Sequence, residues 1–388
     1  MSTWVRVAMG MFIIAFGANH FAPLLPAYRM TAGLSQSQVT FLLGIYALGL
    51  IPSLLIGGPA SDVYGRRALI RPALLLSGLG SLVLILGTTG SFAALAVGRF
   101  IIGTAVGLVM AAGAAWLQEV STGPSYLGPR RATVALSLGF GGGPLVSGLI
   151  AQFLPRPDLL PYLVHLALLA VVAPLVWRTP GGARREDGQR RAMFSRSVLS
   201  RDFLWAVAAW APWGFGAVTT AFATLPDLVK SEVTWTIAYT GVVAATTMGT
   251  GAFIQPLATR FGSSLVPPAI LGLSFVVLGM LVATSVALTR SPWLVFIAAI
   301  LLGAGHGVMM VSGLREVQFI APPAELGAAN AVFYSLTYVG FFAPLALSYL
   351  GPIVGFPTMF LIGAGIAAVS IPPIVHIARG RGSSARPR

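Results

Sequence analysis

The sequence has 388 residues, of which 56% are hydrophobic and only 9% are charged. Soluble globular domains carry about a quarter charged residues, so this composition excludes an ordinary soluble protein. The formal net charge of +14 does not indicate nucleic-acid binding, because the charges lie in the gaps between apolar blocks, as they do in membrane proteins. There is no cysteine, which excludes disulfides and thiolate chemistry.

Long apolar blocks dominate the chain, and each matches the ~20 residues that cross a bilayer as a helix. Because the backbone finds no water in lipid, continuous blocks of this length indicate helices and not the short alternating strands of a barrel. We therefore predict an all-α integral membrane protein with twelve transmembrane helices, the first being a retained span and not a cleaved signal. The predicted spans are 5–27, 37–59, 68–88, 92–118, 132–154, 160–177, 203–226, 236–258, 265–288, 293–315, 327–349 and 353–377.

The basic residues predict the orientation of these spans. Most of the 24 Lys and Arg residues fall in the termini and in the loops on the same side as the termini. The opposite loops hold only Arg29, Arg156, Lys230 and Arg290. Cytosolic loops collect positive charge and lie against anionic headgroups, so both termini are predicted to be cytosolic.

The chain is predicted to consist of two similar halves. The segment 178–202 is rich in Arg and Gly without apolar periodicity, which indicates a cytosolic linker. It separates a six-helix bundle at 1–177 from a second bundle at 203–378, which is followed by a basic tail at 379–388. Two six-helix repeats with both termini on one side predict a secondary transporter whose halves rock around a central site.

Short matches between the halves support the repeat. Leu25-Pro26 is echoed by Leu225-Pro226, and Pro144 by Pro344. The pair Gly103-x-x-x-Gly107 recurs as Gly303-x-x-x-Gly307 at the same offset of 200 residues. The shared offset favours duplication over chance.

The turn between the second and third predicted spans carries an unusual concentration of charge. Asp62 can pair with Arg66 four residues later or cap the next helix, and Glu119 at the end of the fourth span can reach the same arginines. We predict a charge cluster that holds one conformation closed, the alternative being an ordinary salt bridge in a turn. Its predicted members are Gly58, Asp62, Gly65, Arg66, Arg67 and Glu119.

This stretch, Gly58-Pro-Ala-Ser-Asp62-Val-Tyr-Gly65-Arg66-Arg67, resembles the G-x-x-x-D-x-x-G-R-[RK] signature of the major facilitator superfamily. A degenerate copy at 255–262 has Thr259 in place of the acid. The resemblance implies a fold of twelve helices, both termini in the cytosol, and transport by alternating access.

Arg99 lies within the fourth predicted span. A charge in lipid is costly and normally faces a cavity or a partner, although an arginine near a span end can also snorkel to the interface. GRFIIGTAVG at 98–107 resembles the helix-4 arginine motif of the superfamily, which implies a role of Arg99 in proton coupling.

The fifth predicted span carries a stripe of small residues. Gly139-x-x-x-Gly143-Pro144-x-x-x-Gly148 resembles the superfamily's antiporter motif, with Ser147 in place of a glycine. Such a stripe permits close packing and a bend at proline, which any helix bundle can use. The resemblance implies the branch of twelve-helix drug:proton antiporters, and hence efflux.

Other titratable residues are candidates for proton coupling. His20 and His306 lie near mid-depth in the first and tenth predicted spans, and histidine titrates near neutrality. Asp227 is predicted at the outer mouth of the seventh span. The histidines can equally be packing residues, and His165 in the sixth span is predicted to be structural.

Aromatic and amide side chains at helical spacing are candidates for the substrate cavity. Asn330, Tyr334 and Tyr338 recur at every fourth residue and so share one helix face. Such residues can equally pack in the core or face lipid. Together with them we expect an apolar site to be lined by Phe16, Asn19, Trp210 and Trp213.

The sequence thus predicts proton-coupled efflux of a hydrophobic or amphipathic small molecule. A proton-linked importer of a metabolite and a membrane sensor that does not transport are the alternatives. No catalytic constellation, P-loop or metal-ligand spacing is present, so we expect no enzyme, cofactor or metal. The expected partners are the substrate, protons and anionic lipid, with no nucleic acid, and a monomer is expected. A single lysine among 24 basic residues favours a GC-rich bacterial genome and an inner membrane.

Overall fold

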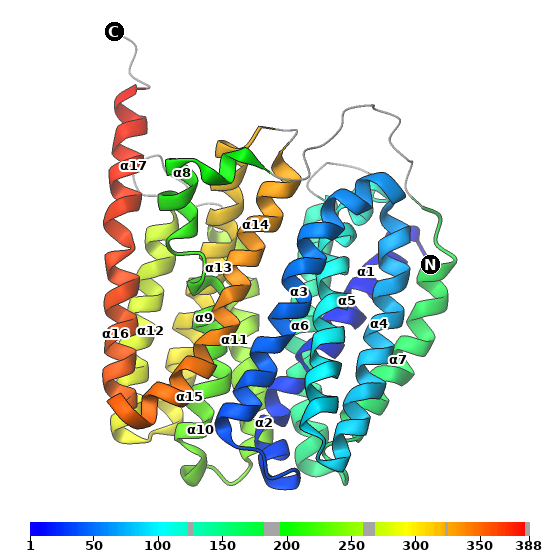
Figure 1. The fold of residues 1–388 in the computed structure, drawn as a ribbon, viewed down its shortest axis with the longest axis vertical. Helices are drawn as coiled ribbons and strands as arrows, with labels where there is room; N and C mark the ends of the chain where they lie inside the picture. The colour runs from blue at the N-terminus through cyan, green and yellow to red at the C-terminus, as the bar shows by residue number, and fades with distance from the viewer. Residues whose placement is uncertain (123–126, 182–194, 259–267, 323–324, 385–388) are drawn as a thin grey trace. The chain divides into compact units, whose positions relative to one another are not determined.

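The computed structural model describes residues 1–122, 127–181, 195–258, 268–322 and 325–384. These residues form helices joined by short turns, without a strand (Figure 1), which confirms the all-α class. The chain divides into two compact units. Unit 1 comprises Met1–Arg191 with Trp235–Ala245, and unit 2 comprises Ala192–Thr234 with Thr246–Arg388.

Unit 1 contains seven described helices and the first part of an eighth. Ser35 begins α3 with a capping box, in which its hydroxyl accepts from the Gln38 amide at 3.2 Å and its own amide donates to Gln38 at 2.8 Å. The helices are α1 (Thr3–Asn19), α2 (Phe21–Thr31), α3 (Gln36–Tyr64), α4 (Arg66–Leu86), α5 (Phe92–Glu119), α6 (Leu127–Phe153) and α7 (Leu160–Trp177), with a 3₁₀ turn at Gly87–Thr89. The long helix α11 (Thr236–Ala258) crosses from unit 1 into unit 2.

Unit 2 holds the remaining described helices. They are α8 (Arg201–Phe203), α9 (Trp213–Thr219), α10 (Leu225–Leu228), α12 (Pro268–Thr289), α13 (Pro292–Ile320), α14 (Leu326–Val339), α15 (Ala343–Val354), α16 (Phe356–Val369) and α17 (Ile371–Ser384). The turns Arg196–Leu199, Lys230–Glu232 and Gly340–Phe342 are 3₁₀. In Figure 1, α17 continues the direction of α16.

Eleven helical stretches of the described chain are long and apolar enough to cross a membrane. They coincide with the predicted spans except 203–226, so the protein is a multi-pass integral membrane protein. The stretches are Thr3–Thr31, Gln36–Ser61, Arg66–Thr89, Phe92–Glu119, Arg130–Phe153, Leu160–Trp177, Thr236–Ala258, Pro268–Thr289, Pro292–Ile320, Leu326–Val354 and Phe356–Ile377.

The predicted span 203–226 is helical but interrupted, which is why it does not count among the eleven. Two π-helical turns, Leu204–Ala208 and Thr220–Thr224, flank α9. Pro212 is the residue before α9, and proline both lacks an amide proton and clashes with the preceding turn. Sequence hydropathy cannot register such breaks, because the interrupted stretch stays apolar.

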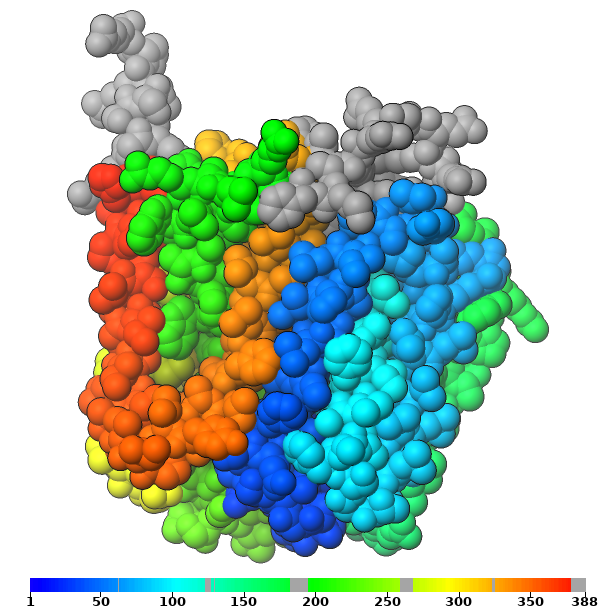
Figure 2. Space-filling view, viewed as in Figure 1, coloured from blue at the N-terminus to red at the C-terminus, as the bar shows by residue number. Residues whose placement is uncertain are grey.

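Exposed leucines mark the lipid-facing side of unit 1. Leu75, Leu79, Leu82 and Leu86 recur along one face of α4, and each is at least 48% exposed. Figure 2 shows α3, α5 and α4 side by side on one face of this unit. An apolar stripe facing outward is expected where lipid is the solvent.

Each unit contains a close helix–helix contact at a glycine, and the two glycines are 200 residues apart. In unit 1, a Cβ added at Gly103 would overlap the Tyr46 carbonyl oxygen, and in unit 2 a Cβ at Gly303 would overlap the Thr247 carbonyl oxygen. Small residues at such points let helix backbones touch. The same glycine, 200 residues later, therefore performs the same packing task in each unit.

Candidate functional site

The turn between α3 and α4 brings an ion pair together. Gly65 has a positive φ of 89°, which favours glycine, and Arg66 begins α4 immediately after it. The Arg66 Nε donates to Glu119 at 3.1 Å, and its Nη1 donates to Ser61 at 2.5 Å. Asp62 belongs to α3, but its side chain lies outside the described residues. The described part of the predicted cluster is therefore the Arg66–Glu119 pair.

Two predicted members of this cluster, Arg67 and Gly58, do not contact the Arg66–Glu119 pair in the way the sequence predicts. The Arg67 Nη2 donates to the Trp177 carbonyl at the end of α7, at 2.9 Å, and Arg71 donates to the same oxygen at 2.8 Å. Arginines commonly satisfy the last carbonyls of a helix in this way. A Cβ added at Gly58 would meet nothing within 4 Å, whereas one at Gly57 would approach Ala111 to 2.9 Å. The tight contact is therefore one residue earlier.

The small-residue stripe of α6 packs directly on the backbone of α1. A Cβ at Gly139 would lie 2.6 Å from the Phe12 carbonyl oxygen, and one at Gly143 would overlap the Phe16 carbonyl oxygen. At Gly148 the Cβ would lie 3.0 Å from Gly241 in α11. No side chain fits at Gly139 or Gly143 unless the backbone of α1 moves, whereas at Gly148 a small shift would suffice.

Polar side chains surround the junction of α1 and α2 at His20, whose backbone keeps the helical conformation. Ser147 donates to the His20 carbonyl at 3.0 Å. Asn19 donates to the Phe140 carbonyl, also at 3.0 Å. These bonds use backbone and side-chain groups that would otherwise stay unpaired in lipid, where each unpaired group costs several kcal/mol. The sequence showed Ser147 only as a departure from a motif.

Arg99 is buried against the same junction, with 2% of its surface exposed. Its Nη1 donates to the Ala18 carbonyl at 2.9 Å and its Nε to the Leu42 carbonyl at 3.2 Å. The guanidinium carbon lies 4.6 Å from the Phe21 ring centre and 4.5 Å from that of Tyr46. Arg99 thus binds carbonyl dipoles and aromatic faces and does not snorkel to the interface.

His20 and His165 lie ring to ring in the core of unit 1, with centroids 5.7 Å apart. Both are fully buried. The His165 Nδ1 is 2.8 Å from the Ser81 hydroxyl, and its ring occupies the space left by Gly17, where a Cβ would overlap it. Neither ring nitrogen of His20 has a hydrogen-bond partner, and such buried groups call for a functional explanation. The prediction for His165 missed this pairing, which joins positions 145 residues apart.

In unit 2, His306 joins an aromatic cluster. Its Nδ1 lies 2.6 Å from the Gly214 carbonyl oxygen. Phe215 packs on His306 with centroids 4.8 Å apart and stacks on Tyr338 at 4.3 Å. His306 is held by one backbone group and by rings, and it lies beside the interrupted segment.

The predicted substrate residues of unit 2 do not form one surface. Trp210 is fully buried, donates to the Ala206 carbonyl and contacts Phe333 at 6.2 Å between ring centres. The Trp213 ring lies beside Gly363 of α16, where a Cβ would come within 3.5 Å of it. The two tryptophans therefore pack in different directions, since a turn separates them.

The predicted stripe of Asn330, Tyr334 and Tyr338 on α14 does not form one surface either. Asn330 and Tyr334 are partly exposed, whereas Tyr338 is buried in the cluster with Phe215. The Asn330 Oδ1 is buried and has no hydrogen-bond partner. In unit 1, Phe16 is buried and stacks on Phe12 at 5.5 Å. Among the predicted substrate residues, Trp213, Asn330 and Tyr334 are the ones that are partly exposed.

Asp227 lies at the end of the interrupted segment, in α10. Its carboxylate pairs with Lys230 at 3.0 Å, three residues later, and its side chain is 27% exposed. Sequence reasoning did not foresee this partner, although the i,i+3 spacing was visible. No group of three or more metal-ligating side chains occurs in the described part of the chain.

Comparison with known sequences identifies the family. Residues 7–340 match the sequence profile of the Major Facilitator Superfamily. The chain is 25% identical to the cephamycin export protein CmcT of Amycolatopsis lactamdurans, over 93% of this chain and 74% of that protein. It is also 36% identical to the Homo sapiens solute carrier family 2, facilitated glucose transporter member 10, over 30% of this chain and 20% of that protein.

Solved structures agree on the fold. A mutant form of the nucleoside transporter NupG superposes with a TM-score of 0.74 at 11% identity, over 99% of this chain and all of that one. The xylose transporter XylE from E. coli gives a TM-score of 0.72 at 12% identity, over 99% of both chains. With the profile match covering most of the sequence, the chain belongs to the Major Facilitator Superfamily and is a membrane transporter, not an enzyme.

Proposed function

We propose that this transporter exports a hydrophobic or amphipathic organic molecule across a bacterial inner membrane while protons enter. The observation that carries the proposal is the alignment with an export protein along 93% of this chain. The glycine contacts of α6 on α1 support it, because they belong to the stretch that resembles the antiporter motif.

The interrupted seventh span favours a substrate-binding region within unit 2. This span, 203–226, is interrupted around Pro212, and interrupted membrane helices commonly form the binding sites of transporters. The orphaned Asn330 oxygen and the Phe215–Tyr338 stack would offer one polar point and an aromatic wall.

The charge distribution favours a substrate without several negative charges. Arg99 is the one buried cation among the described residues, and its donors are used by backbone carbonyls. Sites for phosphates or dicarboxylates use several inward cations. A neutral or singly charged amphipathic molecule fits better.

Proton coupling is assigned to the His20–His165 pair. Imidazole can accept and release a proton during a transport cycle, and the His20 nitrogens have no hydrogen-bond partner. Arg99 and Ser147 bond to the carbonyls of Ala18 and His20, so a change in the charge of His20 would act on the junction that these two residues hold.

Everted membrane vesicles with an acidified interior test the proposal. A lipophilic fluorescent cation should accumulate, the accumulation should collapse with a protonophore, and His20→Phe should abolish it while counterflow of preloaded dye persists. Dye accumulation that the protonophore leaves unchanged would contradict proton coupling.

Right-side-out vesicles test the alternative, proton-linked or facilitated uptake, which the partial match to a glucose transporter favours. Radiolabelled xylose and uridine are the probes. Sugar or nucleoside uptake without dye movement in the everted vesicles would replace the export proposal with an importer.

A further inference from the structure

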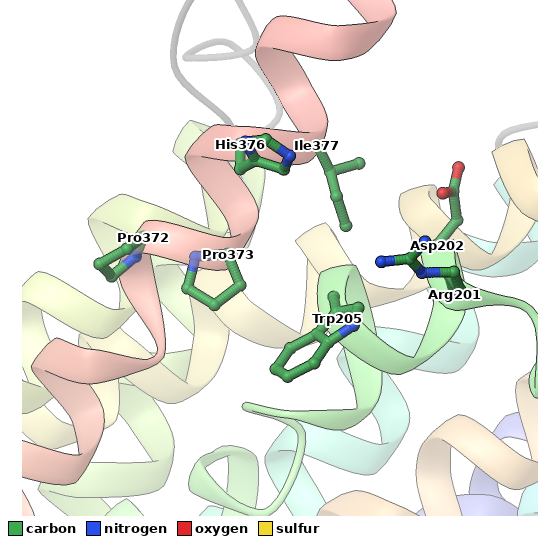
Figure 3. Close-up of a pocket in the computed structure, with 7 residues that line it drawn as sticks. All are labelled: Arg201, Asp202, Trp205, Pro372, Pro373, His376 and Ile377. Carbon is green, nitrogen blue, oxygen red and sulfur yellow. The ribbon is translucent and has the colours of Figure 1, made fainter.

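A cavity of about 700 Å³ lies in unit 2, and none of the candidate site residues described above lines it. Figure 3 shows that it opens between the start of the interrupted segment and the early turns of α17. Its lining residues are Arg201, Asp202, Trp205, Pro372, Pro373, His376 and Ile377. A volume of this size is typical of a site for an organic ligand.

The lining combines an apolar wall with a charged rim that holds one cation, Arg201, and one anion, Asp202. Trp205, Pro373 and Ile377 supply apolar surface, and Trp205 is 50% exposed. The Arg201 guanidinium points toward this space in Figure 3, whereas the Asp202 carboxylate points away from the Trp205 ring. The imidazole of His376 stands on the same rim.

The position of the cavity points to lipid as the occupant. The stretch Phe356–Ile377 is long and apolar enough to cross a membrane, and on it Ile366 and Val369 are 55% and 73% exposed. Its last residues line the cavity, so the cavity lies where the apolar span ends. Tryptophan is enriched at such membrane boundaries.

We propose that this cavity binds an anionic phospholipid of the leaflet in which the span Phe356–Ile377 ends. Arg201 donates to the phosphodiester, which a guanidinium can bind through two parallel hydrogen bonds. His376 contacts the phosphate or the glycerol oxygens. The part of an acyl chain that is nearest the headgroup lies along Trp205, Pro373 and Ile377. This assignment does not depend on the direction of transport or on protons.

Quenching by brominated lipid tests the assignment on the whole protein in nanodiscs. The chain has eight tryptophans, so the contribution of Trp205 is obtained by subtracting the emission of Trp205→Phe. Brominated phosphatidylglycerol and brominated phosphatidylcholine are each supplied as a minor fraction of the lipid. The test variants are Arg201→Gln and Arg201→Gln with His376→Gln, each with its own Trp205→Phe reference.

The matched control is Arg196→Gln, which removes an exposed arginine of the same unit that does not line the cavity. Phosphatidylglycerol should quench Trp205 at a lower lipid fraction than phosphatidylcholine. Arg201→Gln should reduce this preference about fivefold, as expected for one basic residue at a membrane surface. The control should keep the preference, and millimolar inorganic phosphate should not displace the lipid.

Three results would overturn the proposal. Equal quenching by the two lipids in the unmodified protein would exclude headgroup recognition. Displacement of the lipid signal by free phosphate would assign the rim to a soluble anion. Displacement by the transported dye would assign the cavity to the substrate. Folding of each variant is checked by its thermal transition, so loss of quenching cannot be mistaken for unfolding.

Discussion

Ser147 donates a hydrogen bond of 3.0 Å to the main-chain carbonyl of His20. The bond joins α6 to the junction of α1 and α2. A serine fits at a motif position that otherwise holds glycine because it is small and because its hydroxyl has a main-chain carbonyl as partner at this junction.

Ser147→Ala should therefore lower the free energy of unfolding by about 1 kcal/mol, the usual net value of one buried hydrogen bond. The matched control is Ser335→Ala, because the Ser335 hydroxyl is also buried but bonds only to Ala331 of its own helix. Thermal unfolding in detergent measures both. Equal losses of unfolding free energy in the two variants would show that the bond to His20 stabilises the protein no more than a bond within one helix.

Gly143→Ala should reduce both stability and transport, since its Cβ would overlap the Phe16 carbonyl oxygen. Overpacking of this kind costs roughly 1–3 kcal/mol. Gly142→Ala is the control, because a Cβ there would meet nothing within 4 Å, and alanine favours the helix by up to ~1 kcal/mol. A stable, active Gly143→Ala protein would show that α1 and α6 can separate at this point without loss.

Neutralising Glu119 should affect transport far more than stability. The Arg66–Glu119 pair is partly exposed, and such pairs contribute less than ~1 kcal/mol to folding. If the pair closes one conformation, Glu119→Gln should slow dye efflux about tenfold, within the usual range of conformational coupling.

The exchange variant Arg66→Glu with Glu119→Arg should recover part of the activity. Asp62→Asn should abolish efflux while the protein still inserts in the membrane. Unchanged efflux in all three variants would remove this turn from the transport cycle.

Arg99→Lys should destabilise unit 1 although the charge is kept. Lysine cannot reproduce the planar donors that reach both the Ala18 and the Leu42 carbonyls, and losing one charged hydrogen bond costs roughly 1.5–3 kcal/mol. The control is Arg130→Lys at an exposed site. Arg99→Ala should also abolish proton-driven dye accumulation; persistence of the accumulation would limit Arg99 to a structural role.

Glu325 provides a pH-dependent prediction outside the membrane spans. The hydroxyls of Ser195 and Ser197 donate to its carboxylate at 2.7 and 2.8 Å, and these bonds lower the pKa of Glu325 below its ordinary 4.5. A lowered pKa means that the contribution to stability is present above pH 4.5 and is lost as the pH falls through the lower folded-state value.

Glu325→Gln should accordingly lower the melting temperature at neutral pH, and the difference from the unmodified protein should shrink on acidification. Glu232→Gln, at an exposed site whose carboxylate accepts from Ser231, should show a smaller difference at neutral pH. Melting curves of both variants and of the unmodified protein, recorded from neutral pH down to the lowest pH at which the protein is still folded, measure these differences. A difference that grows on acidification would contradict the assigned direction.

Hydropathy by itself determined the membrane class and eleven of the spans, and glycine spacing predicted the repeat. These are local properties: lipid demands about 20 apolar residues per helix, and only glycine permits backbone contact at positions such as Gly103 and Gly303. The positive φ at Gly65 likewise follows from a turn that is visible in the sequence.

Only the tertiary structure decided which side chains meet. The pairing of His20 with His165, the bonding of Arg67 to Trp177, and the separate directions of Trp210 and Trp213 depend on helix rotation. In an apolar chain almost every face is hydrophobic, so sequence periodicity does not indicate which face turns inward. Packing of distant helices sets that rotation, and with it the partners of the few polar groups.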